Sequence, residues 1–151
     1  MRLAADDAEA ELLWRLRRSM HASMEPHGTR LVEDVSVPRS ALPAMFDEIA
    51  RIEREYGLVI PTIAHAGDGN LHPSFLFDGG EVPAMVWDAA DDLFRAALRL
   101  GGTLTGEHGV GILKRRWLAD ELGEDQWQLQ RQIARVFDPQ GILNPGKVFT
   151  P

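Results

Sequence analysis

Two histidines, His65 and His72, bracket a glycine-rich turn in this 151-residue chain. The segments on either side, residues 58–65 and 71–77, are rich in β-branched and other apolar residues and are predicted to form a β-hairpin. If the two histidines lie opposite each other in that hairpin, their Cβ atoms are about 4.5–5.5 Å apart. Two imidazoles at that separation can bind one metal ion, or both can be structural residues of the hairpin.

Glu107 and His108 form a second group that could do chemistry. Three glycines surround the pair: Gly106, Gly109 and Gly111. Glycines at this density let the backbone come close to another group. Neighbouring side chains of an extended segment point to opposite sides, so one of the two can join the hairpin histidines on a metal while the other faces a substrate. Two imidazoles and one carboxylate with open positions suit zinc, manganese or ferrous iron.

Helices and strands that interleave along the chain must position these groups. Apolar residues recur every three or four positions in residues 6–24, which predicts a helix with one buried face. The same reasoning predicts helices over residues 42–56, 83–100, 113–122 and 125–136, and alternation predicts a strand over residues 31–37. The predicted pairing is a hairpin and no crossover looks parallel. The sequence therefore predicts an α+β fold with a mostly antiparallel sheet.

Composition excludes several classes of function. Sixteen Lys and Arg against 23 Asp and Glu give a formal charge of -7, which argues against a nucleic-acid partner. The absence of cysteine excludes disulfides, thiolate zinc sites and cysteine nucleophiles. No apolar run approaches the roughly 20 residues of a transmembrane helix. The expectation is one domain, residues 1–151, of a soluble cytoplasmic protein without a transmembrane segment.

Three motifs, in this order, resemble the C-terminal domain of FAD-linked oxidases. They are residues 65–73 (HAGDGNLHP), residues 101–111 (GGTLTGEHGVG) and the tail, with Asp138-Pro139 and residues 144–147 (NPGK). The family includes D-lactate dehydrogenase, the glycolate oxidase flavin subunit and D-2-hydroxyglutarate dehydrogenase, and the resemblance covers nearly the whole chain. It implies a ferredoxin-like antiparallel sheet with helices packed on it, lying as a cap over FAD. The FAD-binding domain is expected to be absent from this chain, so the chain alone is expected to be inactive.

The resemblance also implies roles for four residues of the first two motifs. His65, His72 and Glu107 would be the ligands of a divalent zinc, manganese or iron ion. His108 would be the catalytic base that takes the hydroxyl proton of a small 2-hydroxy acid while hydride leaves C2 for FAD. The physical chemistry is consistent, because a metal bound to the hydroxyl lowers its pKa enough for a neutral imidazole to act as base.

Further positions match family residues outside this group. Arg17 and Asn70 match substrate-binding positions, although Arg17 can also belong to a solvated helix face. Lys114, Asn144 and Lys147 match positions where contact with the flavin cofactor or with the FAD-binding domain or subunit is expected. Lys114 can alternatively belong to a basic surface cluster.

One departure bears on the substrate. Family members that take dicarboxylates carry a lysine near the position of Val32, so a smaller acid such as D-lactate or glycolate is favoured. Two other classes of function stay open, a metal-dependent hydrolase active by itself and a non-catalytic assembly domain. An uncovered flavin-facing surface would also favour a homo-oligomer. The full enzyme is expected in the cytoplasm, with peripheral membrane association as an option.

Overall fold

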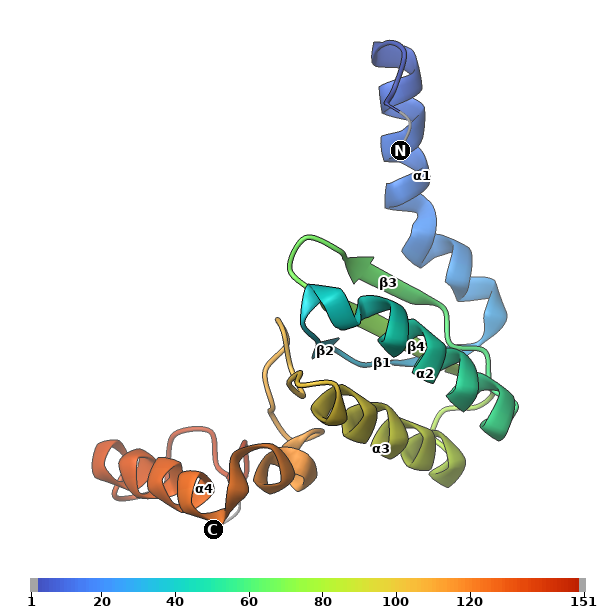
Figure 1. The fold of residues 1–151 in the computed structure, drawn as a ribbon. Helices are drawn as coiled ribbons and strands as arrows, with labels where there is room; N and C mark the ends of the chain where they lie inside the picture. The colour runs from blue at the N-terminus through green and yellow to red at the C-terminus, as the bar shows by residue number, and fades with distance from the viewer. Residues whose placement is uncertain (1–2, 150–151) are drawn as a thin grey trace.

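The computed structural model describes residues 3–149 (Figure 1). Its helices are α1 (Asp7–Met24), α2 (Leu42–Tyr56), α3 (Ala84–Arg99) and α4 (Leu118–Phe137). Its strands are β1 (Thr29–Val32), β2 (Val35–Ser36), β3 (Thr62–His65) and β4 (Asn70–Phe77). Short 3-10 turns cover η1 (Glu25–His27), η2 (Arg39–Ala41) and η3 (Arg115–Trp117). This element order confirms the predicted α+β class and the predicted hairpin.

Strand β4 is the centre of an antiparallel sheet. Its Leu71 pairs with Ala64 of β3 on one side and with Val35 of β2 on the other. Strand β1 continues the β2 side, and a bridge from Ser36 to Thr103 adds the segment after α3 at that edge. The resulting order, with a helix after β2 and after β4, is that of a ferredoxin-like βαββαβ unit.

The predicted strand over residues 31–37 is split into β1 and β2 because of Pro73. The register of Val32 with Ser74 is the same as that of Val35 with Leu71, so no residue is inserted between the two strands. The Glu33 N–H donates to the Pro73 carbonyl at 2.9 Å. Proline has no N–H to donate in return, so the ladder is interrupted at this point.

Helices α2 and α3 cover one face of the sheet and form the core with it (Figure 1). Val35, Leu71 and Phe75 are completely buried against them. Helix α2 ends as predicted at Gly57, whose φ of 64° is the left-handed conformation that glycine adopts readily. Because side chains alternate along a strand, the even-numbered residues of β4, including His72, lie on the other face of the sheet.

Helix α1 forms as predicted, but the prediction of a buried face is wrong for most of its length. Figure 1 shows it projecting away from the sheet. Its large apolar residues are half exposed or more: Leu12, Leu13, Trp14 and Leu16. Among the α1 side chains that the structure describes, only Met24, at the C-terminal end, is buried. Periodicity detects an apolar stripe, and this stripe has no packing partner among the residues that the structure describes.

The C-terminal region matches the two predicted helices closely. Helix α4 is interrupted at Gly123, whose φ of 72° and ψ of 161° are not helical. This break falls between the two ranges that periodicity predicts. Within residues 3–149, no helix combines the length and the apolar character that crossing a membrane requires.

Candidate metal centre

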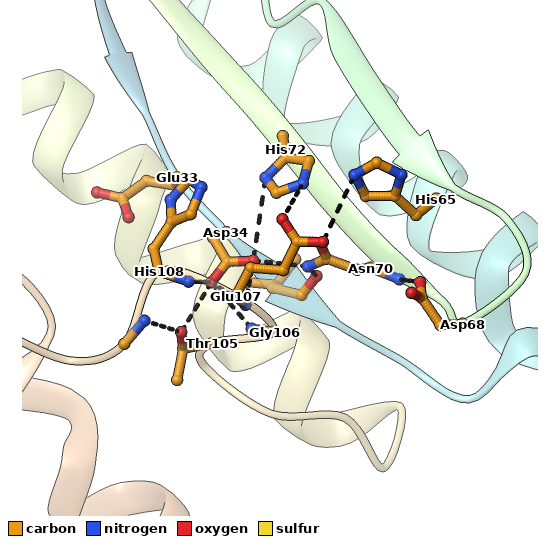
Figure 2. Close-up of polar contacts among 12 residues, drawn as sticks. Glu33, Asp34, His65, Asp68, Asn70, His72, Thr105, Gly106, Glu107 and His108 are labelled. Atoms are coloured by element: carbon orange, nitrogen blue, oxygen red, sulfur yellow. Dashed lines mark hydrogen bonds and ion pairs between the residues drawn. The ribbon is translucent and has the colours of Figure 1, made fainter.

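His65, His72 and Glu107 come together on the face of the sheet opposite the helices (Figure 2). His65 is the last residue of β3, His72 lies in β4, and Glu107 lies in the glycine-rich loop after α3. The two carboxylate oxygens of Glu107 lie 3.6 Å from His65 Nε2 and 3.5 Å from His72 Nε2. One ligand atom from each residue lies within 4.8 Å of the other two. Residues distant in the sequence therefore meet as the two motifs predict.

This arrangement has the dimensions of a metal site. Distances of 3.5 and 3.6 Å are long for hydrogen bonds between these atoms. Two ligands about 2.1 Å from one tetrahedral ion are themselves about 3.4 Å apart, so the observed spacing fits a shared divalent ion. The side chains of His65 and Glu107 are 40% and 51% exposed, which leaves the outer side open to substrate oxygens.

The hairpin register differs from the one expected for the two histidines. His65 pairs with Asn70, and His72 pairs with Ile63, so the histidines are diagonal neighbours and not opposite each other. The expected pairing is wrong because the turn has four residues, 66–69, and not six. Their rings still meet at a centroid distance of 5.2 Å and an angle of 86°, because diagonal partners share a face of the sheet.

His108 lies beside the group of three. Its ring stacks on that of His72 with a centroid distance of 5.0 Å and an interplanar angle of 25°. Of the adjacent acid and imidazole in the loop, Glu107 joins the histidines of the hairpin. His108 is not a member of that group of three, and its predicted role as a base stays a prediction.

A buried carboxylate, Asp34, holds the loop in place, and the sequence analysis missed it. Its Oδ2 accepts hydrogen bonds from the backbone N–H groups of Gly106, Glu107 and His108, at 2.9, 3.1 and 3.0 Å. The hydroxyl of Thr105 donates to the same oxygen at 2.7 Å. The signal available in the sequence was a pair of adjacent acidic residues, Glu33 and Asp34, inside a predicted strand, because buried carboxylates need partners.

Asp34 is held ionised by these partners. Its burial alone would raise the pKa of the carboxyl. The N–H of His108, the hydroxyl of Thr105, the amide of Asn70 and the charge of Lys114 together hold the pKa of Asp34 well below its ordinary value. The ionised Asp34 carboxylate therefore keeps its negative charge at neutral pH next to the cluster of His65, His72 and Glu107.

The pKa of His72 lies below the ordinary value for histidine. Burial lowers the pKa of His72, and the neighbouring His108 and His65 lower it further, against the charges of Asp34 and Glu107. A lowered pKa favours the neutral imidazole at neutral pH. The neutral form is the one that binds a metal ion.

Lys114 and Asn70 are buried in the structure, and their predicted contacts with cofactor and substrate stay predictions. The Lys114 ammonium donates to the backbone carbonyls of Asp34 and Leu104 and lies 3.5 Å from Asp34 Oδ2. Lys114 is 3% exposed and therefore does not belong to a basic surface cluster. The Asn70 amide donates to Asp34 Oδ1 at 2.6 Å and to the Val35 carbonyl at 3.0 Å, so both of its donors serve the fold.

Arg17, Asn144 and Lys147 are not brought to the metal group. Arg17 lies in the projecting α1, and no hydrogen bond or ion pair joins it to a site residue in the part of the chain that the structure describes. Asn144 and Lys147 are exposed in the C-terminal tail. The Val148 N–H ties this tail to the Gly111 carbonyl at 2.8 Å, beside the glycine-rich loop. Their predicted contacts with substrate and flavin stay predictions.

Glu33 makes the stability of the chain depend on pH. It is 1% exposed, its Oε1 has no hydrogen-bond partner among the described residues, and burial raises its pKa to about 7 against the opposing charge of Lys114. The native state then keeps a proton that the unfolded chain releases near pH 4.5. The free energy of unfolding should therefore fall as pH rises from about 4.5 to 7, by about 3 kcal/mol in all.

Glu33→Gln should remove this dependence, because glutamine carries no charge at any pH. We expect the variant and the parent chain to have similar stability at pH 5, and the variant to be more stable at pH 8, as measured by urea unfolding. Glu25→Gln, at an exposed position, is the matched control. It should show the same difference in the free energy of unfolding between pH 5 and pH 8 as the parent chain. A pH dependence in Glu33→Gln equal to that of the parent would contradict the assignment.

Comparison with known proteins places these features in a family. The family model of FAD linked oxidases, C-terminal domain, matches residues 1–148. Glycolate oxidase subunit GlcD of Bacillus subtilis (strain 168) is 40% identical over 97% of this chain and 32% of its own length. GlcD of Escherichia coli (strain K12) is 33% identical over 97% of this chain and 30% of its own length. D-lactate dehydrogenase [cytochrome] 1, mitochondrial, of Saccharomyces cerevisiae is 35% identical over 97% of this chain and 26% of its own length.

The chain thus spans about a third or less of the length of these curated relatives. The match to the family model extends over both histidine motifs and into the tail motif. The chain therefore belongs to the family of FAD linked oxidases, C-terminal domain.

Proposed function

We propose that this chain is the substrate- and metal-binding cap domain of an FAD-dependent 2-hydroxy acid dehydrogenase or oxidase. The observation that carries the proposal is the convergence of two imidazole Nε2 atoms on the carboxylate of Glu107, at distances that fit one divalent ion. The names of the relatives, glycolate oxidase and D-lactate dehydrogenase, support a small 2-hydroxy acid as substrate. The family name supports FAD, which the rest of the enzyme would bind.

The residues of the chain divide the work of the reaction. His65 and His72 would hold zinc, manganese or iron through Nε2, and Glu107 would hold it through a carboxylate oxygen. Such an ion supplies a Lewis acid that lowers the pKa of a bound hydroxyl and stabilises the alkoxide. The imidazole of His108, next to His72, would accept the hydroxyl proton. FAD would supply the acceptor for the hydride lost from C2.

Val32 supports a substrate with a single carboxylate. It pairs with Ser74, and Ser74 lies on the same face of β4 as His72, so Val32 is on the metal-binding face of the sheet. An apolar residue there offers no charge to a second carboxylate. D-lactate and glycolate fit this surface better than a dicarboxylate does.

Binding of hydroxy acids to the metal-loaded chain tests the proposal without flavin. We expect the chain to take up one Co²⁺ and the visible spectrum of the bound Co²⁺ to change when glycolate or D-lactate is added, because hydroxyl and carboxylate oxygens enter open positions. Propionate, which lacks the hydroxyl, should give a weaker change, and His65→Ala should weaken Co²⁺ binding by removing one proposed ligand.

A Co²⁺ spectrum indifferent to both hydroxy acids would contradict the substrate assignment. Hydrolysis of a carboxylic ester by the metal-loaded chain in the absence of flavin would favour a hydrolase instead.

A further inference from the structure

We propose that Asp34 is a positioning residue of the metal centre, and that its one carboxylate sets both the loop that carries Glu107 and His108 and the orientation of His72. This inference rests on the proposed function, since it concerns how the ligands and the base are arranged. Asp34 belongs to neither histidine motif and lies more than 30 residues before the first of them.

The first half of the argument concerns the loop. Residues 106–108 belong to no helix or strand, so no ladder of backbone hydrogen bonds fixes them. Instead, three successive backbone N–H groups donate to Asp34 Oδ2 at 2.9–3.1 Å. Hydrogen bonds to an ionised carboxylate are about twice as strong as those between neutral groups. The positions of Glu107 and His108 relative to the sheet therefore depend on this oxygen.

The second half concerns the other oxygen of the same carboxylate. Asp34 Oδ1 lies 3.9 Å from His72 Nδ1, while the other ring nitrogen, Nε2, faces Glu107. If His72 uses Nε2 for the metal, its proton must be on Nδ1, facing Asp34. At 3.9 Å the carboxylate is not hydrogen-bonded to His72, and it is the negative charge of Asp34 that favours the tautomer with its proton on Nδ1.

The carboxylate itself is fixed by groups from several parts of the chain. The Lys114 ammonium lies 3.5 Å from Asp34 Oδ2, and the Asn70 amide donates to Oδ1. The loop can come this close only because residue 106 is glycine. A Cβ at Gly106 would lie 2.2 Å from Asn70 Nδ2 and 2.4 Å from Ser36 Oγ. The loop therefore packs at Gly106 against Asn70 and is hydrogen-bonded to Asp34.

Asp34→Asn tests this role because it keeps the shape of the side chain and replaces one acceptor oxygen with a donor. In the metal-free chain, we expect hydrogen exchange at the amides of residues 106–108 to become at least about tenfold faster. Zinc affinity, measured by competition with a chromophoric chelator, should fall by about 10- to 100-fold. The spectrum of bound Co²⁺ should also change, which a remote effect on stability would not produce.

Thr105 provides a matched pair of variants on the same carboxylate. Its hydroxyl donates to Asp34 Oδ2 and accepts from the Gly109 N–H at 2.8 Å. Thr105→Ser keeps this hydroxyl and should retain the exchange rates and zinc affinity of the parent within about twofold. Thr105→Val removes the hydroxyl at nearly constant volume and should shift both measurements in the direction of Asp34→Asn.

Unchanged amide protection or unchanged zinc affinity in a folded Asp34→Asn chain would overturn the proposal. If that variant fails to fold by circular dichroism, the Thr105 pair decides, and equal behaviour of the two Thr105 variants would overturn it. If the parent chain binds no zinc, the proposed function fails, while hydrogen exchange in the metal-free chain still decides whether Asp34 fixes the loop.

Discussion

His72→Ala is expected to weaken zinc binding by the chain on the order of a hundredfold or more, because it removes one of three protein ligands and the one that is best fixed. The side chain of His72 is 12% exposed, against 40% for His65, and it contacts His65 on one side and His108 on the other. Its loss therefore leaves His65 and Glu107, whose side chains are both exposed to solvent. Competition with a chromophoric chelator, at a fixed pH, measures the change.

His27→Ala is the matched control for this prediction. His27 is an exposed histidine in η1, away from the group of three, and its removal should leave zinc affinity unchanged. It also corrects for weak binding of zinc to surface imidazoles. Equal zinc affinity in His72→Ala and His27→Ala would remove His72 from the ligand set and require another arrangement of the site.

The parts of the fold that could be predicted are those fixed by local sequence. The hairpin follows from two β-rich segments around a turn, and Gly57 ends α2 where a left-handed residue is needed. The motif residues His65 and His72 were recognisable because the chain brings them close through a short turn. Even there, the register was wrong, since a sequence with several turn residues is compatible with turns of different length.

Asp34 and Lys114 show what local sequence does not predict. The carboxylate of Asp34 receives its hydrogen bonds from residues about 36 to 74 positions further along the chain. Lys114 looks like part of a basic surface cluster with its two arginine neighbours, yet it is 3% exposed. Its burial depends on the carboxylate and the carbonyls that the sheet places around it, and these partners are known only from the three-dimensional fold.

The first helix illustrates a different limit. The apolar stripe of α1 was predicted correctly as a stripe, and the inference that it would be buried was wrong for Leu12, Leu13 and Leu16. Amphipathic periodicity indicates that a helix face prefers an apolar partner, without indicating whether that partner belongs to the same segment of chain. Arg17 lies on the same helix, and its predicted contact with substrate stays a prediction.

His108→Ala, in an enzyme that combines this chain with its FAD-binding part, is expected to slow flavin reduction by D-lactate or glycolate about 10²- to 10⁴-fold. Zinc affinity and FAD content should stay those of the parent. The reason lies in the backbone, because alanine keeps the N–H that donates to Asp34 at 3.0 Å, so the Glu107 loop keeps its anchor. Anaerobic stopped-flow absorbance of the flavin measures the reduction rate.

Added imidazole separates a lost base from a distorted site. If the ring of His108 only supports His72 by stacking, His108→Ala should lower zinc affinity. Exogenous imidazole should then leave the slow rate of flavin reduction unchanged. If the ring accepts the hydroxyl proton, a free imidazole entering the vacated space should restore part of the rate while zinc affinity is unaffected. Parental reduction rates in His108→Ala would exclude the residue as the base.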